Sequence, residues 1–359
     1  MTSRRLLLLG VAAIVAIATA IILSHQRTAS VTAAGDTLYP ALKDELNAVT
    51  AVRIYQSGDT RAVELLRRDG QWTVTDRSGY AADGVKVRKL LLALAEAKPV
   101  EEKTSNPENY PALGVEDTSA ATASGARIEL EGVSKPVNLI VGKAAGMKGT
   151  YVRRAGEPAS WLVNESINAS ATTHDWLQTS IIDVTADRVQ SVNVTVDNKS
   201  YTASKAARAD ADFRIDAMPK GKEADTFSVN NLASALSSLT LADVLPAQDF
   251  GAEKPSAHAT VKTFDGLVAD LDGYRKNDKY YVTVTAAYDG ALAQRFHVET
   301  KTPANADAKA DEAAAPKADA DTVEQTAKAT NDSLKGWVFE IAGYKYDAIF
   351  KPIAELTKK

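Results

Sequence analysis

Apolar residues beyond residue 46 follow two alternating spacings. In the segment 71–76, Trp72 and Val74 alternate with polar residues, and this period of two indicates a half-buried strand. In the segment 84–97 the spacing changes to i, i+3, i+4, i+7, which places four apolar side chains on one face of a helix. These four residues are Val87, Leu90, Leu91 and Leu94. The pattern therefore predicts a strand followed by an amphipathic helix.

The same succession returns about 140 residues further along the chain. The first copy opens with the strand-like segment 49–56 and the second with the segment 189–197. Phe213 and Ile215 then repeat the alternation of the first copy's tryptophan strand. The helical spacing recurs at Val229, Leu232, Ala233 and Leu236. Strand and helix patterns in one order at one offset indicate an internal duplication.

After each helix the chain returns to strand patterns. In the first copy these patterns cover 126–132, 137–142, 150–154 and 160–164. The segment 61–68, ahead of the helix, also belongs to the first copy. In the second copy the patterns cover 258–264, 267–274, 279–288, 295–300 and 336–343, and a short helix closes the chain at 344–356. Asp265-Gly266 between two of these strands suits a tight hairpin. Sequential antiparallel strands with one or two helices per copy predict an α+β class.

Residues 302–333 interrupt the second copy. They consist mainly of Ala, Asp, Lys and Thr and contain no aromatic residue. Such a segment buries too little apolar surface to offset the entropy lost on ordering, although alanine favours helix. We therefore expect a low-complexity surface insertion that contributes little to the core.

The N-terminal residues 6–23 contain no charged and no strongly polar residue. About 18 residues in a helix span a hydrocarbon core of roughly 30 Å. Arg4 and Arg5 precede this run, and the positive-inside tendency then places residues 1–5 in the cytoplasm. A cleaved signal peptide is the alternative, but its apolar region is normally shorter and a small-residue cleavage site follows it promptly. The run predicts a transmembrane anchor in the inner membrane, with the bulk of the chain in the periplasm.

Together these patterns predict an architecture. An N-terminal transmembrane helix at 6–23 and a tether at 24–45 precede two similar β-rich α+β repeats, built of antiparallel sheets with one or two helices each. The repeats occupy 46–180 and 181–359, and the second carries the insertion 302–333.

Composition excludes several functional classes. The chain of 359 residues has no cysteine, so disulfides, thiolate nucleophiles and cysteine-ligated metals are excluded. The formal net charge is −4, which is mildly acidic. The sequence also shows no cluster of Lys and Arg of the kind that nucleic-acid binding requires.

Candidate catalytic and ligand-binding residues are few. His25, His174, His258 and His297 do not form a metal-ligand spacing, and no HExxH motif occurs. The glycine-rich stretch 142–149 lacks the lysine-serine/threonine ending of a phosphate-binding loop, so we expect a hairpin loop. Contact of Lys143 and Lys148 with an anionic partner is the weaker alternative. Asp210, Asp212 and Asp216 lack the glycine and glutamate of a calcium loop. We therefore expect no catalytic, cofactor-binding or metal-binding residues, and no enzyme.

Several motifs occur together in the first copy. They comprise the tryptophan strand at 71–76, the leucine-rich helix, the proline loop KTSNPENYPALGV at 103–115, the LIVGK strand, the TYVRR strand and the segment 174–184. In this order they resemble a bacterial envelope family of domains of unknown function. The resemblance implies a single-pass envelope protein encoded beside gliding-motility-type ABC transporter genes. It implies no catalytic residues.

Three functions remain open from the sequence. The first is a non-enzymatic, membrane-anchored periplasmic accessory protein whose partners are ABC transporter subunits, because sheet edges and faces suit partner binding. The second is a periplasmic binding module for a glycan or lipid-linked polymer, which would require Trp161, Trp176 and Trp337 to be exposed in one groove. The third is a hydrolase, which would require a cleft with two facing carboxylates or a Ser/Lys pair.

Overall fold

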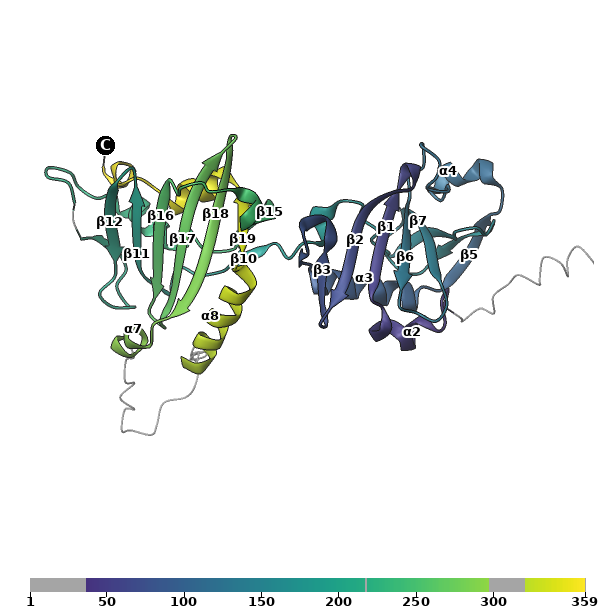
Figure 1. Cartoon of the computed structure of the whole chain (residues 1–359), viewed down its shortest axis with the longest axis horizontal. Coiled ribbons are helices and arrows are strands. Elements are labelled where there is room, and N and C mark those ends of the chain that lie inside the picture. Colours follow the sequence, from purple (N-terminus) through teal and green to yellow (C-terminus); the bar gives the residue numbers. More distant parts are fainter. Residues whose placement is uncertain (1–36, 217, 297–319, 359) are drawn as a thin grey trace, which may run out of the picture. The chain divides into compact units, whose positions relative to one another are not determined.

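The structure is a computed structural model that describes residues 37–216, 218–296 and 320–358. The chain divides into two compact units, Met1–Leu177 and Gln178–Lys359, and each is described by itself. The sequence placed this division between residues 180 and 181. Figure 1 shows that each unit is built around a sheet of strands.

Unit 1 is built on one antiparallel sheet whose strands follow the order β4-β3-β2-β1-β6-β7-β8-β9-β5. The strands are β1 (Ala51–Gln56), β2 (Thr60–Arg68), β3 (Gln71–Val74), β4 (Tyr80–Ala81), β5 (Pro99–Thr104), β6 (Ala126–Glu131), β7 (Val137–Ala145), β8 (Gly149–Arg154) and β9 (Ser160–Val163). The α-helices are α2 (Leu42–Glu45), α3 (Gly84–Glu96) and α4 (Tyr110–Leu113), and 3-10 turns cover Leu46–Ala48, Ser57–Asp59, Thr75–Arg77, Pro107–Asn109 and Thr173–Trp176.

The two faces of the unit 1 sheet differ in chemistry. Val52, Ile54, Ile128, Leu139 and Val152 point to one face and are fully buried. The predicted apolar face of α3 supplies the covering layer, and its four periodic residues are between 0% and 5% exposed. The residues that alternate with them point to the opposite face, because successive side chains of a strand face opposite ways. That second face carries charged side chains such as Arg53, Glu64 and Arg127.

Unit 2 repeats the plan with the strand order β13-β12-β11-β16-β17-β18-β19-β15. The strands are β11 (Val189–Val196), β12 (Lys199–Ser204), β13 (Arg214–Ile215), β15 (Asp243–Pro246), β16 (Ala257–Thr263), β17 (Leu267–Lys276), β18 (Lys279–Tyr288) and β19 (Trp337–Ile341), and β10 (Ser180–Ile182) pairs separately with β14 (Leu239–Thr240). The helices are α5 (Thr226–Asn231), α6 (Ala247–Phe250), α7 (Gly290–Arg295), α8 (Ala320–Leu334) and α9 (Gly343–Ile349), with 3-10 turns at Leu232–Ser234 and Ile353–Leu356.

The two sheets share one strand order once the extra strand β4 is set aside. The unit 1 order is β3-β2-β1-β6-β7-β8-β9-β5. Strand for strand, it corresponds to the unit 2 order β13-β12-β11-β16-β17-β18-β19-β15. In each unit the helical segment lies in the chain between the first and last strands of this row. This correspondence is what a duplicated chain produces.

The predicted fold class is wrong as it was stated. Antiparallel sheets, rather than an α+β mixture, dominate the described residues, because most apolar segments alternate with period two and pair with their neighbours in the chain. No helix within residues 37–216, 218–296 and 320–358 is long and apolar enough to cross a membrane. The apolar run at 6–23, which carried the predicted transmembrane helix, lies outside the described residues.

The predicted insertion is also corrected. Residues 302–319 lie outside the described residues, but Ala320–Leu334 form α8, which contacts β18. Val323, Ala327 and Leu334 are buried, because spacings of four and seven place them on one helical face. Most of the strand expected at 295–300 lies outside the described residues, since Arg295 ends helix α7 and residues 297–300 are not described.

Candidate functional site

A loop closes part of the polar face of unit 1. It connects β5 to β6 and contains Pro107–Asn109 and α4. Tyr110 and Val115 of this loop form a buried cluster with Ile140 of β7. Gly114 ends α4 with φ +72°, a conformation that glycine adopts without strain. The proline loop of the sequence is therefore packed onto the sheet.

Glycines allow the loop to lie close to the strands. A Cβ atom at Gly142 of β7 would overlap the Leu113 carbonyl oxygen, and one at Gly125 would overlap that of Gly114. Lys143 Nζ also donates to the carbonyl oxygens of Pro111 and Ala112, at 3.1 and 3.0 Å. Gly125 in the loop and Gly142 in the LIVGK strand are therefore needed for the same reason: a side chain at either position would prevent the loop from lying this close to the strands.

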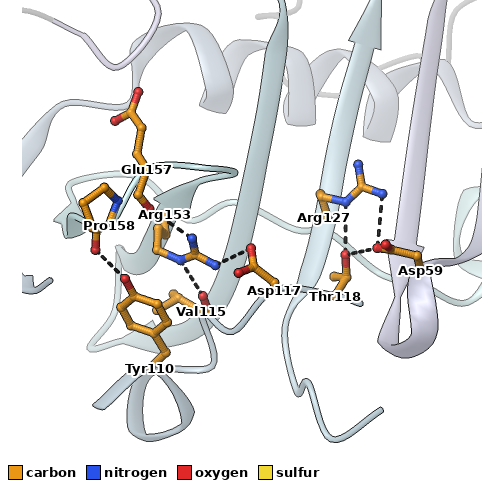
Figure 2. A network of polar contacts seen from close by, with 9 residues as sticks. All are labelled: Asp59, Tyr110, Val115, Asp117, Thr118, Arg127, Arg153, Glu157 and Pro158. Atoms are coloured by element: carbon orange, nitrogen blue, oxygen red, sulfur yellow. Dashed lines mark hydrogen bonds and ion pairs between the residues drawn. The ribbon is translucent and has the colours of Figure 1, made fainter. Parts of the chain in front are cut away.

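Arg153 fastens the loop from the sheet side. Its side chain is 3% exposed, and each guanidinium nitrogen donates one hydrogen bond. Nε donates to Val115 O at 2.8 Å, Nη1 to Glu157 O at 3.0 Å and Nη2 to Asp117 Oδ1 at 2.7 Å, as Figure 2 shows. The guanidinium carbon also lies 4.5 Å from the ring centroid of Tyr110, a cation–π distance.

Arg127 of β6 fastens the following residues in the same way. Its Nε donates to Thr118 Oγ1 at 3.0 Å, and its Nη2 lies 3.3 Å from Asp59 Oδ1 (Figure 2). Thr118 Oγ1 in turn donates to Asp59 Oδ1 at 2.6 Å. This hydrogen bond, reinforced by the charge of Arg127, lowers the pKa of the Asp59 carboxyl. The donors of both arginines are therefore directed at the protein's own acceptors, which makes this network a structural clamp.

The polar face of unit 2 carries a different set of side chains. Nδ1 of His258 in β16 lies at hydrogen-bond distance, 2.8 Å, from Asp272 Oδ1 of β17. Its Nε2 lies 3.3 Å from Thr260 Oγ1, which donates to Asp270 Oδ1 at 2.6 Å. The side chains of His258, Asp270 and Asp272 are 40% to 44% exposed. Sequence reasoning treated His258 as a lone residue because its partners are distant in the chain.

The order carboxylate, imidazole, hydroxyl resembles a nucleophile relay, but its surroundings do not support one. The Thr260 hydroxyl donates to Asp270 rather than to the imidazole, so the histidine is not placed to remove its proton. The strands on both sides engage the backbone N–H groups of β16 in ladders, which leaves none there to stabilise an oxyanion. The group lies on an open sheet face, which suits binding better than chemistry.

The three tryptophans of the glycan hypothesis do not share one environment. Trp176 is 2% exposed, and its Nε1 donates to Ser170 O at 2.9 Å. Trp161 in β9 is half-buried in unit 1, and Trp337 in β19 is half-buried in unit 2. Trp176 is thus a core residue.

The remaining candidates occupy ordinary structural positions. The glycine-rich stretch forms the hairpin between β7 and β8, as expected, and leaves Lys148 exposed. His174 lies in the 3-10 turn Thr173–Trp176. The aspartates of the second copy accept hydrogen bonds from neighbouring groups: Asp210 from two backbone N–H groups, Asp212 from Asn230 and Asp216 from Ser204. His25 and His297 lie outside the described residues.

No group of three or more His, Cys, Asp or Glu side chains is arranged to hold a metal ion in the part of the chain that the structure describes.

Comparison with known proteins places the chain in a family. A family model described as "Domain of unknown function (DUF4340)" matches residues 72–262, slightly more than half of the chain. The match begins in the strand of Trp72 and ends in β16, so it spans the boundary between the two units. No curated protein and no solved structure matches. The chain therefore belongs to the DUF4340 family of domains of unknown function.

Proposed function

We propose that this protein is a non-enzymatic accessory protein of the bacterial envelope that works by binding a partner protein. The observation that carries the proposal is the contrast between the two equivalent sheet faces. Unit 1 closes its polar face with its own clamped loop, whereas unit 2 leaves polar groups near His258 exposed. An exposed sheet face with fixed polar groups suits recognition of another protein.

The location belongs to the same proposal. The apolar residues 6–23, preceded by Arg4 and Arg5, would hold the chain at the inner membrane with both units in the periplasm. The resemblance to envelope proteins encoded beside gliding-motility-type ABC transporters supports transporter subunits as the partners.

Two experiments test the proposal. Reporter fusions at the C-terminus address location, and we expect alkaline phosphatase to be active there and a cytoplasmic fluorescent reporter to be dark. Affinity purification of the full chain from cross-linked membranes addresses the partner, and we expect it to recover transporter subunits. Recovery of no transporter subunit, under conditions that retain known membrane complexes, would refute the association.

The alternative of a glycan-binding module has less support. That function usually relies on aromatic side chains exposed together, and Trp176 is buried with its ring nitrogen bonded to Ser170 O. Binding of the full chain to isolated peptidoglycan or to polysaccharide, without any protein partner, would favour it.

A further inference from the structure

Unit 2 presents a polar surface that we call the open face. It consists of His258 and Thr260 on β16, Asp270 and Asp272 on β17, and Thr283 on β18. The pairings His258 with Asp272 and Asp272 with Thr283 place these side chains on one side of the sheet. Figure 1 shows β11, β16 and β17 side by side in the sheet of unit 2.

Strand register identifies the counterpart of this surface in unit 1. Ile54 pairs with Ile128, and at the equivalent position Val194 pairs with Ala259. Counting back one residue from Ile128 and Ala259 makes Arg127 the counterpart of His258. Arg127 pairs with Ile140 and His258 pairs with Asp272, so the next strands correspond as well.

The counterpart surface in unit 1 is occupied. Residues 115–118 of the clamped loop lie over it and supply a carbonyl oxygen to Arg153, a carboxylate to Arg153 and a hydroxyl to Arg127. The same sheet position thus binds a polypeptide segment in one copy of the duplicated unit. There the sheet provides the cations and the segment provides the acceptors.

The equivalent connection in unit 2 does not reach the open face. It spans only residues 247–256, between β15 and β16. Phe250 packs against Tyr274 and Tyr281 at ring-centroid distances of 5.2 and 5.1 Å, and Lys276 Nζ donates to Phe250 O at 2.7 Å. The connection therefore covers the sheet beside Tyr274 and Tyr281 and leaves Asp270 and Asp272 exposed.

The open face carries carboxylates where its counterpart in unit 1 carries arginines. Arg127 and Ile140 of unit 1 are replaced by His258 and Asp272 in unit 2. Asp270 and Asp272 interact with Thr260 and His258, and no lysine or arginine of the described residues forms an ion pair with either of them. A cation brought to these carboxylates would gain charge-assisted hydrogen bonds of the kind that hold the loop in unit 1.

We infer that the open face of unit 2 is a docking surface for an arginine- or lysine-bearing segment of a partner protein. This inference rests on the proposed partner-binding function, and it names the surface and the chemistry of what binds there. The partner's cations contact Asp270 and Asp272 in place of the pairing that unit 1 makes within its own chain.

A pair of labelled peptides tests the charge complementarity. Both are extended serine- and threonine-rich peptides of one length, and one carries three arginines where the other carries three glutamates. We expect the arginine peptide alone to bind the full chain, and to bind more weakly at an ionic strength near 1 M, where the Debye length is about 3 Å. The double variant D270N/D272N should raise its Kd at least tenfold. Equal affinity for the wild type and the double variant would overturn the inference.

The control is the double variant D187N/D332N. It removes the same charge from exposed sites of unit 2 outside the open face. It should leave the Kd within twofold of the wild-type value. Because Asp270 and Asp272 are exposed, all the variants should retain the wild-type circular dichroism spectrum and melting temperature within a few degrees. A tenfold loss of binding in the control as well would show nonspecific charge attraction and reject the surface.

A photo-cross-linker at Thr283 of the full chain in membranes separates this inference from the proposed function. We expect adducts to arginine- or lysine-bearing peptides of a transporter subunit. These adducts should be lost in D270N/D272N. If that subunit co-purifies with the wild type but cross-links equally in D270N/D272N, the docking surface is wrong and the proposed function stands. If no protein partner is recovered at all, the proposed function fails. Adducts to a second copy of this chain or to polysaccharide would contradict the occupant.

Discussion

Asp83 and Asp225 hold the same position in the two units. Asp83 is the N-cap of α3 and Asp225 the N-cap of α5. The Asp83 side chain accepts from two backbone N–H groups of the first turn, and the Asp225 side chain accepts from one. Each also donates its own backbone N–H, at 2.8 Å, to a carbonyl oxygen near the end of its unit: Asp83 to Trp176 and Asp225 to Leu356. One residue thus joins the start of the helix to the last segment of the unit, and both units contain this joint.

The first prediction concerns these two caps. Asp83→Ala and Asp225→Ala should each lower the free energy of unfolding by about 1 kcal/mol, because each removes the acceptor for helix N–H groups. Asp83→Asn and Asp225→Asn should cost less, since asparagine caps nearly as well. Urea denaturation followed by circular dichroism measures these differences. Equal losses for alanine and asparagine would show that the cap hydrogen bonds are not the stabilising contact.

The second prediction concerns the clamp at Arg153. Arg153→Ala should destabilise unit 1 by about 2–4 kcal/mol, because Val115 O and Glu157 O would lose a buried donor. Arg153→Lys should also be destabilising, since one ammonium cannot reproduce three donors in a planar fork.

Limited proteolysis of the loop provides the structural measurement for this clamp. Cleavage within residues 105–118 should become faster in Arg153→Ala than in wild type. Arg208→Ala, which removes an exposed ion pair with Asp187, is the control and should change stability by less than about 1 kcal/mol. Unchanged cleavage in Arg153→Ala would mean that the Tyr110 cluster holds the loop without the arginine.

The sequence predicted the elements whose apolar residues have a regular period. The helix at Gly84–Glu96 and the hairpin through Asp265-Gly266 are confirmed. The second-copy helix keeps its predicted buried face, but it is divided into α5 and the 3-10 turn Leu232–Ser234. Period reports which face is buried, and it does not report how tightly a turn is wound.

The clamp and the open face could not be predicted in the same way. Arg153 lies in a strand as a polar residue, and period two alone would place it in solvent. It is buried because a loop 36 residues earlier, at Asp117, folds over it. The packing of helix α8 was missed for a related reason, since the low-complexity composition concealed the helical spacing of Val323, Ala327 and Leu334.

The third prediction tests the buried helical faces. Leu94→Ala in unit 1 and Leu236→Ala in unit 2 should each cost about 2–5 kcal/mol, because both side chains are almost fully buried. Lys89→Ala and Ser234→Ala, at exposed positions of the same segments, should stay within about 0.5 kcal/mol of wild type. Thermal denaturation compares the four variants. A cost at Leu236 no larger than that at Ser234 would show that the second copy lacks an equivalent core.

The fourth prediction replaces the expectation that residues 302–333 are dispensable. Leu334→Ala should cost about 2–5 kcal/mol, since its side chain is 3% exposed. Val323→Ala should cost less, because fewer methyl groups are removed. Glu324→Ala on the exposed side of α8 is the matched control and should be nearly neutral. Melting temperatures that do not differ among the three variants would return the segment to the role of a surface insertion.

The last prediction uses the pH dependence of Asp265. Arg188 Nε donates to Asp265 Oδ2 at 2.9 Å and Nη2 to Oδ1 at 3.2 Å, and Thr263 Oγ1 also donates to the carboxylate. Burial raises the pKa of this carboxyl, but the hydrogen bonds from Arg188 and Thr263 outweigh it, so the pKa in the folded protein is lowered. A lowered pKa means that the folded state favours the ionised form.

The stability from this carboxylate is therefore fully present above the pKa of an unfolded aspartate, about 3.9, and is lost as the pH falls below that value through the folded pKa. Asp265→Asn should lower the free energy of unfolding by about 1.5–3 kcal/mol at pH 7, because it weakens hydrogen bonds made to a charged group. The difference from wild type should shrink as the pH is lowered below about 4. Urea denaturation across pH 3 to 7, values chosen to bracket that pKa, measures it. A difference that stays constant across the range would show that Arg188 does not select the ionised carboxylate, and that the turn is held by Thr263 and the backbone alone.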